Sequence, residues 1–266
     1  MSDKKASILG VLVDATTYEQ VVSAVIDAAK QGRAMTVAAA AVHAIMVAVQ
    51  DAQFRYRLNR FDFVTPDGQP VRWALRWLHG LRLPSRVYGP TLTLHLCRAA
   101  EDQGVRVCFY GSRPETLAAL RDNLQRDFPR LQIVATEPSV FRRLTEEEQR
   151  ALYARITASQ AQLVFVGLGC PRQEIWAYEA RDRLNMPIVA VGAAFDFISG
   201  SKPQAPEWMQ NRGLEWLFRL THEPGRLWRR YLLLNPLYLI LLALQYLKLK
   251  NHPVQGEVVE LPHRYG

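Results

Sequence analysis

The sequence has few cysteines and lacks the common nucleotide-binding and metal-binding motifs. Its three cysteines, Cys97, Cys108 and Cys170, form no C-x-x-C pair, which argues against a disulfide scaffold and favours a reducing compartment. The motifs G-x-x-x-x-G-K-[ST], H-E-x-x-H, G-x-S-x-G and D-x-D are all missing, and the six histidines are never paired at a metal-binding spacing. We therefore expect no metal ion and no cofactor, and we expect cationic side chains to neutralise any phosphate groups of a ligand.

The composition is that of a globular protein with an excess of positive charge. Of 266 residues, 49% are hydrophobic and 22% are charged, with 15 Gly and 15 Pro, so wholly disordered and collagen-like chains are excluded. The length allows one large domain or two modest ones. The 33 Lys and Arg against 25 Asp and Glu leave a net charge of +8, which indicates an anionic partner such as a phosphorylated substrate, a nucleic acid or an anionic lipid.

Half of this excess lies in one apolar segment. Residues 206–250 carry seven basic and three acidic side chains, a net charge of +4. At the other end of the chain, Asp14 ends a short apolar run without a cleavage site of the signal-peptide type. We therefore expect a cytosolic protein, at least at its N-terminus.

Apolar runs alternate with helix-like segments over the first 200 residues. The clearest runs are ILGVLV (8–13), MTVAAAAV (35–42), FDFV (61–64), VRVCFYG (105–111), LQIVAT (131–136), QLVFVGLG (162–169) and PIVAVGAAF (187–195). Between them, Thr17 with Gln20 and Thr145 with Glu148 form capping boxes that predict helix starts. This alternation predicts an α/β fold with a largely parallel sheet and flanking helices.

The alternation stops after Gly200. We therefore predict an α/β core over residues 1–203, a basic and apolar helical appendage over 204–250, and a disordered tail over 251–266.

Several predicted strands end in glycine just before a helix, where ligands of parallel sheets bind. Gly111 ends one such strand, and Gly167 and Gly169 end another, followed by Gln173. The second pair resembles the start of a dinucleotide fingerprint, but Arg172 stands where the third glycine belongs, which argues against a nicotinamide cofactor. Either the segment is simply a tight turn, or it is a loop that binds the phosphates of a nucleotide.

Three charged residues lie at similar positions. Asp67, in Thr65-Pro66-Asp67-Gly68, is either ordinary turn chemistry or a general base at a strand end. Arg86, in Arg-Val-Tyr-Gly, is either a solvated surface group or a cation of the same site, depending on whether it lies near Asp67. Asp196 ends the last apolar run and either caps the next segment or contacts a ribose or base.

Taken together and in order, six segments resemble the WecB/TagA/CpsF glycosyltransferase family (glycosyltransferase family 26). They are TPDGQPV, RVYGPTL, FYGS, VFVGLGCPRQE, VGAAFDFISG and GLEWLFRLTHEPGRLWRRY, and they extend the resemblance over about residues 8 to 235. The resemblance implies transfer of a sugar from a UDP-sugar to a polyprenyl-diphosphate-linked acceptor at the cytoplasmic face of the membrane. It also implies inversion at the anomeric carbon, no metal ion, and a Rossmann-like core followed by an appendage that helps to complete the active site.

The resemblance also assigns roles to residues of this chain. It implies that Asp67 is the general base and that Arg86 is a catalytic cation which, with the appendage arginines, stabilises charge on the diphosphates. It implies that Gln173 contacts the donor. From their positions at strand ends and in loops, we expect Gly111, Gly167, Gly169 and Asp196 to bind the donor as well. It implies that the diphosphates and the acceptor are bound by the appendage arginines Arg219 and Arg226, with Arg229 or Arg230 following.

One departure from the family concerns the donor. Many members carry Thr-x-Asn near the end of the second predicted strand, whereas Ala39 and Ala41 stand in that stretch here, with His43 nearby. The identity of the donor sugar is therefore left open.

The most apolar stretch, residues 231–247, has Arg229 and Arg230 before it and Lys248 and Lys250 after it. Its 17 residues are at the short limit for a membrane span, and Asn235-Pro236 interrupts it. An interfacial helix, a re-entrant or spanning helix, and a helix buried in the fold or in a homo-oligomer all stay open. The basic flanks and nearby aromatic residues favour the interface, and hence peripheral attachment to the inner face of the plasma membrane.

Two non-enzymatic functions compete with this hypothesis. A nucleic-acid-binding module is disfavoured because the basic residues lie beside an apolar run that would be costly to expose. The other alternative is an inactive family member that acts as a scaffold in polysaccharide assembly. The missing Thr-x-Asn supports it, and the retained Asp67, Arg86 and Gln173 argue against it.

Overall fold

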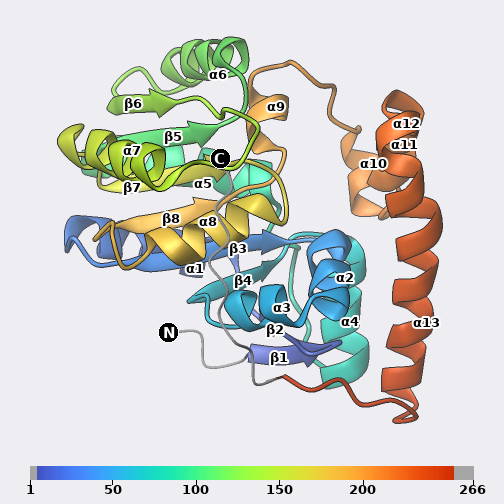
Figure 1. The fold of residues 1–266 in the computed structure, drawn as a ribbon. Helices are drawn as coiled ribbons and strands as arrows, with labels where there is room; N and C mark the ends of the chain where they lie inside the picture. The colour runs from blue at the N-terminus through green and yellow to red at the C-terminus, as the bar shows by residue number, and fades with distance from the viewer. Residues whose placement is uncertain (1–4, 255–266) are drawn as a thin grey trace.

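The computed structural model describes residues 5–254 and contains a six-stranded sheet with helices on both faces (Figure 1). All of its strand pairs are parallel, in the order β4-β3-β8-β7-β5-β6. The strands are β3 (Met35–Ala40), β4 (Phe63–Pro66), β5 (Val107–Gly111), β6 (Ile133–Glu137), β7 (Leu163–Gly167) and β8 (Pro187–Ala190). The predicted α/β fold with a parallel sheet is confirmed.

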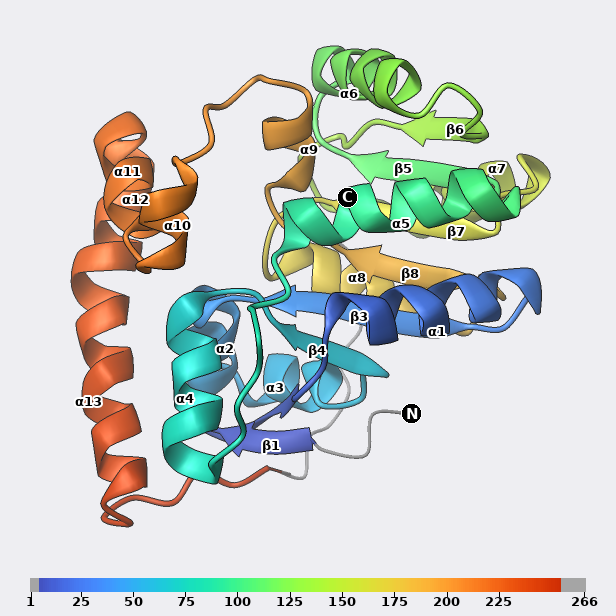
Figure 2. The same ribbon diagram turned by 180° about the vertical axis from the view of Figure 1, so that it is seen from behind.

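Alternate residues of each strand point to opposite faces of the sheet, and each face has its own apolar core. On one face, Phe109 stacks on Phe165 with ring centroids 4.9 Å apart, whereas on the other Tyr110 packs against Trp176 at 4.7 Å. The first core, seen in front in Figure 2, joins the sheet to α1 (Tyr18–Lys30), α5 (Gly89–Gln103), α6 (Pro114–Asp127) and α9 (Ala194–Ile198). The second joins it to α2 (Val42–Gln50), α3 (Ala52–Leu58), α4 (Gln69–His79), α7 (Glu146–Ala158) and α8 (Arg172–Ala180).

Local signals in the sequence set the helix ends. Both predicted capping boxes are present, at the starts of α1 and α7, and in the second the Thr145 amide donates to Glu148 Oε2 at 2.8 Å. These reciprocal bonds satisfy amides that a helix start otherwise leaves unpaired.

The apolar run at residues 8–13 does not form the single strand that we predicted. It is part of a hairpin of β1 (Lys5–Ile8) and β2 (Val11–Asp14), which reverses at Leu9 and Gly10 with φ of 52° and 85°. A two-residue turn with positive φ matches the twist of paired strands. The sequence hides the turn because its first residue, Leu9, is fully buried and continues the apolar pattern.

The last apolar run is also divided. β8 ends at Ala190, Gly192 adopts a φ of 65°, and Ala194–Ile198 forms α9. Asp196 therefore lies in the first turn of a short helix and not at the end of a strand, which corrects our prediction.

The C-terminal segment is helical and stands beside the core. It comprises α10 (Glu207–Asn211), α11 (Glu215–His222), α12 (Pro224–Arg229), η1 (Arg230–Leu234) and α13 (Asn235–Tyr246). In Figure 1, α13 runs upright past α2 and α4. Buried Tyr238 donates to the Pro70 carbonyl at 3.2 Å, and Gln245 accepts from the Leu9 amide of the hairpin at 2.9 Å. One side of α13 thus packs on the core, while most of the predicted tail, residues 255–266, lies outside the described residues.

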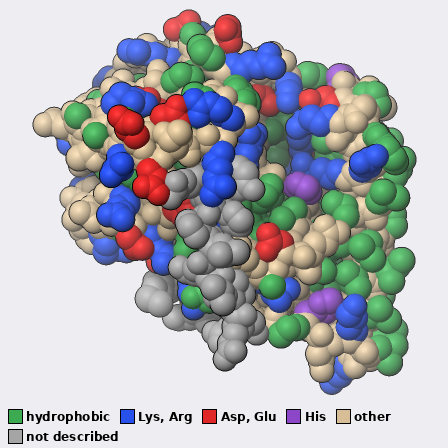
Figure 3. Space-filling view, in the orientation of Figure 1, with side chains coloured by type: hydrophobic (Ala, Val, Ile, Leu, Met, Phe, Trp, Pro, Cys, Tyr) green, Lys and Arg blue, Asp and Glu red, His purple; other side chains and the backbone are tan. Residues whose placement is uncertain are grey.

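The opposite side of the C-terminal helix is apolar and exposed. Figure 3 shows hydrophobic side chains gathered along the edge where α13 lies. Leu233, Leu239 and Ile240 are 57%, 55% and 58% exposed. By length and composition, Pro224–Tyr246 could cross a membrane: its 23 residues include an 18-residue window with a mean hydropathy of 1.3. Only 28% of that window is buried, so the protein core does not cover most of it.

Two glycines let the ends of β5 and β7 approach each other closely. Gly111 pairs with Gly167, and a Cβ on Gly111 would lie 2.7 Å from the Gly167 carbonyl carbon. A Cβ on Gly167 would lie 2.5 Å from the buried ring of Phe195. Both glycines are therefore required by backbone and ring packing at this edge of the sheet.

We expect Gly167→Ala to lower the free energy of unfolding by about 1–3 kcal/mol, because the Phe195 ring must shift within a packed core. Urea unfolding followed by circular dichroism measures this change. Gly225→Ala is the matched control, since a Cβ there meets nothing within 4 Å in a helix, and its stability should equal wild type or exceed it by up to about 1 kcal/mol. Equal stability of the two variants would contradict the packing role.

Candidate active site

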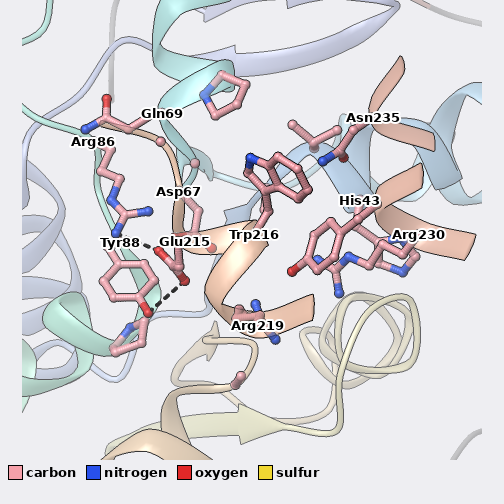
Figure 4. A pocket seen from close by; sticks show the side chains of 18 of the residues that line it. His43, Asp67, Gln69, Arg86, Tyr88, Glu215, Trp216, Arg219, Arg230 and Asn235 are labelled. Carbon is pink, nitrogen blue, oxygen red and sulfur yellow. Dashed lines mark hydrogen bonds and ion pairs between the residues drawn. The ribbon is translucent and has the colours of Figure 1, made fainter. Parts of the chain in front are cut away.

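A pocket lies where the carboxyl ends of β3, β4 and β8 meet the C-terminal segment (Figure 4). In parallel sheets, the loops and helix starts that follow the strands lie at this carboxyl-end edge, which is the usual ligand site of such folds. The core contributes Ala41, His43, Asp67, Gln69, Arg86, Tyr88, Val191 and Ala193, among others. The C-terminal segment contributes Gly213, Glu215, Trp216, Arg219, Arg230, Tyr231 and Asn235.

Asp67 stands in the turn that ends β4, and backbone groups fix its position. Its amide donates to the Ala40 carbonyl at 3.3 Å, and its Oδ1 accepts from the Gly89 amide at 3.2 Å. Burial raises the pKa of Asp67 to about 6, and the nearby Glu215 carboxylate adds to this, against the opposing effects of Arg86, the Gly89 amide and Arg219. The carboxyl is therefore ionised at neutral pH and is a stronger base than an ordinary aspartate.

Arg86 lies in the same pocket, as the hypothesis of a shared site with Asp67 requires, and it is paired with an acid. Its Nη2 lies 2.9 Å from Glu215 Oε2, and both side chains are nearly buried, with exposures of 11% and 13%. Tyr88 donates its hydroxyl hydrogen to the other oxygen of Glu215 at 3.1 Å, and the Arg86 guanidinium lies over the Tyr88 ring. Figure 4 shows this cluster beside Asp67.

Two further arginines face the pocket without an acidic partner. Within residues 5–254, neither Arg219 nor Arg230 forms an ion pair with a carboxylate; their guanidinium groups lie 5.6 Å from the ring centres of Phe197 and Tyr231. Burial lowers the pKa of Arg230, and repulsion from Arg219 contributes. Cations that are held together without counter-charge form a site for an anion, and bidentate bonds from guanidinium to phosphate are strong.

The end of β3 bears small apolar residues in the stretch where many members of the resembled family carry Thr-x-Asn. Ala39 is buried near Gly89, whereas Ala41 and His43 line the pocket. Burial lowers the pKa of His43 to about 4, and the positive charges of Arg230 and Arg219 contribute, so the imidazole is neutral at pH 7. Its Nδ1 has no hydrogen-bond partner among the described residues.

The predicted donor-binding residues do not line this pocket. Gly111 and Gly167 lie at the ends of neighbouring strands, and Gly169, with a φ of 80°, turns the chain into α8. Gln173 is buried; its Oε1 accepts from the Gly192 amide at 3.1 Å and its Nε2 donates to Glu174 at 2.8 Å. It thus connects the loops that follow β7 and β8. Asp196 forms an ion pair with Lys202 at 2.8 Å.

Of the predicted appendage arginines, the structure brings Arg219 to the pocket. Arg226 is exposed and forms an ion pair with Glu223, and Arg229 is exposed beside Trp228. Arg230, the alternative to Arg229, is the residue that faces the pocket. Sequence reasoning missed Tyr88, Glu215 and Trp216, although all three stand inside segments that carried the resemblance, RVYGPTL and GLEWLFRL.

Among residues 5–254, no group of three or more His, Cys, Asp or Glu side chains could hold a metal ion. Independence from metal ions stays a prediction.

Comparison with known proteins identifies the family of the chain. Residues 6–252 match the model of the glycosyl transferase WecG/TagA/CpsF family, and the chain belongs to that family. It is 33% identical over 186 residues, 70% of each chain, to an N-acetylglucosaminyldiphosphoundecaprenol N-acetyl-beta-D-mannosaminyltransferase from Bacillus spizizenii. The pocket is accordingly the candidate active site of a glycosyltransferase.

We expect Gln173→Ala to lower the free energy of unfolding by about 1–3 kcal/mol, because it removes the acceptor of the Gly192 amide and one of the hydrogen bonds to buried Glu174. Chemical denaturation measures the loss, and exposed Gln125→Ala in α6 is the control that should change little. If the Gln173→Ala variant is as stable as wild type, its side chain does not hold the two loops together.

Proposed function

We propose that this protein is an inverting, metal-independent glycosyltransferase that moves a sugar from a UDP-sugar to a polyprenyl-diphosphate-linked saccharide. The observation that carries the proposal is that one pocket holds both Asp67, a carboxylate with a raised pKa, and two arginines, Arg219 and Arg230. Neither arginine forms an ion pair with a carboxylate of the described residues. Transfer from a nucleotide sugar needs both: a base for the acceptor hydroxyl and cations for the departing diphosphate.

In the proposed reaction, the oxygen of the acceptor hydroxyl attacks the anomeric carbon of the donor, and Asp67 takes the proton of that hydroxyl. The bond from that carbon to the phosphate oxygen breaks, and its electron pair leaves with UDP. Attack opposite the leaving group inverts the anomeric centre. Arg219 and Arg230 stabilise the charge that develops on the diphosphate, with Arg86 as the cation next to Asp67.

The relative from Bacillus spizizenii is named for transfer of N-acetylmannosamine. UDP-N-acetylmannosamine is therefore the first donor to test, with N-acetylglucosaminyl diphosphoprenol as acceptor. Contacts of Gly111, Gly167, Gly169, Gln173 and Asp196 with the donor, and of Arg226 and Arg229 with the acceptor, stay predictions. The alternative is an inactive scaffold of polysaccharide assembly.

We further propose that the protein attaches peripherally to the cytoplasmic face of the plasma membrane through its C-terminal helix. The exposed leucines and isoleucine of η1 and α13 form an apolar surface next to basic Arg229, Lys248 and Lys250. Such a surface suits the headgroup boundary of an anionic membrane, which is where a lipid-linked acceptor presents its diphosphate.

The test of catalysis is a transfer assay in detergent with a short-chain prenyl-diphosphate acceptor and a panel of labelled UDP-sugars, with and without EDTA. We expect transfer from one donor, insensitive to EDTA. Asp67→Asn should lower kcat by about 10²–10⁴-fold while UDP still binds, because the amide cannot accept the proton. For wild type, kcat/KM should rise with pH through about 6 as Asp67 loses its proton.

Exposed Asp122→Asn is the control, and it should match wild type. Full activity of Asp67→Asn would remove Asp67 from the mechanism. Failure to bind UDP at all would favour the scaffold.

The test of attachment is sedimentation with anionic phospholipid vesicles. We expect the double variant Leu233→Gln/Ile240→Gln to lose most of its binding, because both side chains are more than half exposed on the apolar surface, at 57% and 58%. Leu94→Gln on α5, 37% exposed, is the control. Undiminished binding would place the anchor elsewhere, and resistance of wild type to alkaline extraction would favour a spanning helix.

A further inference from the structure

Glu215 is the acidic side chain that the C-terminal segment places beside the proposed base. It stands at the start of α11 and contacts Arg86 at 2.9 Å and the Tyr88 hydroxyl at 3.1 Å. Two glutamines before it strengthen the same junction. Gln210 accepts from Arg86 Nη2 at 2.8 Å, and Gln204 donates to the Tyr88 hydroxyl at 3.3 Å.

On the core side, the segment Arg86–Gly89 is hydrogen-bonded to the turn that contains Asp67 and to Tyr18. The Val87 amide donates to the Pro66 carbonyl at 3.0 Å, and the Tyr88 amide donates to the Tyr18 hydroxyl at 2.9 Å. The Gly89 amide donates to Asp67 Oδ1 at 3.2 Å. A bridge of four residues therefore runs from Glu215 in the appendage to Asp67 in the core.

Glu215 also acts on Asp67 through charge. The groups that face Asp67 are the cations Arg86 and Arg219, the hydroxyls of Tyr18 and Tyr88, and the carboxylate of Glu215, with His43 and Arg230 farther along the pocket wall. After burial, which is the largest cause, repulsion from Glu215 raises the pKa of Asp67. By pairing with Arg86, Glu215 also offsets the cation that most strongly lowers that pKa.

We propose that Glu215 is a positioning residue through which docking of the C-terminal segment sets the strength of the general base. With the segment docked, the carboxylate of Glu215 holds Arg86 and Tyr88, and Asp67 is buried as a strong base. With the segment displaced, Asp67 faces an unpaired Arg86 and water, and it is a weaker base. This proposal rests on the proposed function, because it takes Asp67 as the base.

The test compares pH profiles of kcat/KM in the full-length protein. Glu215→Gln keeps the size of the side chain and a hydrogen bond with Tyr88 but removes the charge. We expect the midpoint of its acid limb to move down by about one pH unit. We also expect plateau kcat to fall about threefold or more, as a weaker base requires. Glu215→Asp, which keeps the charge, should move the midpoint back toward wild type.

Gln210→Ala is the matched control, since it removes a contact to Arg86 from the same segment without a change of charge. Its midpoint should equal that of wild type. A Glu215→Gln profile with an unchanged midpoint, whether or not kcat falls at every pH, would overturn the proposal, because loss of structure alone lowers kcat without moving the limb.

A second measurement does not depend on activity. Carboxyl ¹³C NMR of labelled aspartate, with Asp67 assigned by Asp67→Asn, follows the ionisation of this group directly. A lower midpoint in Glu215→Gln supports the coupling even if no donor is transferred, in which case only the proposed function fails. An equal midpoint in both proteins refutes the coupling.

Discussion

The ion pair between Arg86 and Glu215 connects the two parts of the molecule on which the pocket depends. The sheet and its loops supply Asp67 and Arg86. The C-terminal helices that follow supply the other pocket residues with positive or aromatic side chains, which are Arg219, Arg230, Trp216 and Tyr231. A nearly buried pair is costly to break from one side, because the remaining charge loses its partner in a poorly solvated place. Docking of the C-terminal segment and the arrangement of the strand-end loops are therefore energetically linked.

Charge is distributed unequally within this pocket. Within the described part of the chain, one arginine of the pocket, Arg86, pairs with a carboxylate, and Arg219 and Arg230 do not. Arg86, the paired arginine, lies in the loop next to Asp67, whereas Arg219 and Arg230 leave the pocket with a net positive charge. At the end of β3, Ala41 and the neutral His43 line the pocket close to Arg230, whose positive charge helps to keep the imidazole neutral.

Much of the fold was predictable because its signals are local. Apolar strands, two capping boxes and strand-end glycines are short stretches of sequence, and they correctly predicted a parallel sheet. Whether Arg86 lies near Asp67 was left open, because that depends on how the loops pack. The turn at Leu9 was missed because a buried apolar side chain occupies it. The pairing of Glu215 with Tyr88 joins residues 127 positions apart, and no local pattern reports such a contact. Arg229 and Arg230 differ by about 100° around a helix, so only the packing of that helix decides which one faces the pocket.

The position of the pocket residues along the chain has a consequence for synthesis. The last strand of the sheet ends at Ala190, but the pocket is not complete until Asn235. Because domains fold from the N-terminus as the chain leaves the ribosome, the sheet can form before the site exists. On the proposed function, a nascent or prematurely terminated chain would then have a folded sheet but no transferase activity. The same apolar helix completes the site and carries the proposed membrane-binding surface, so both would emerge from the ribosome together.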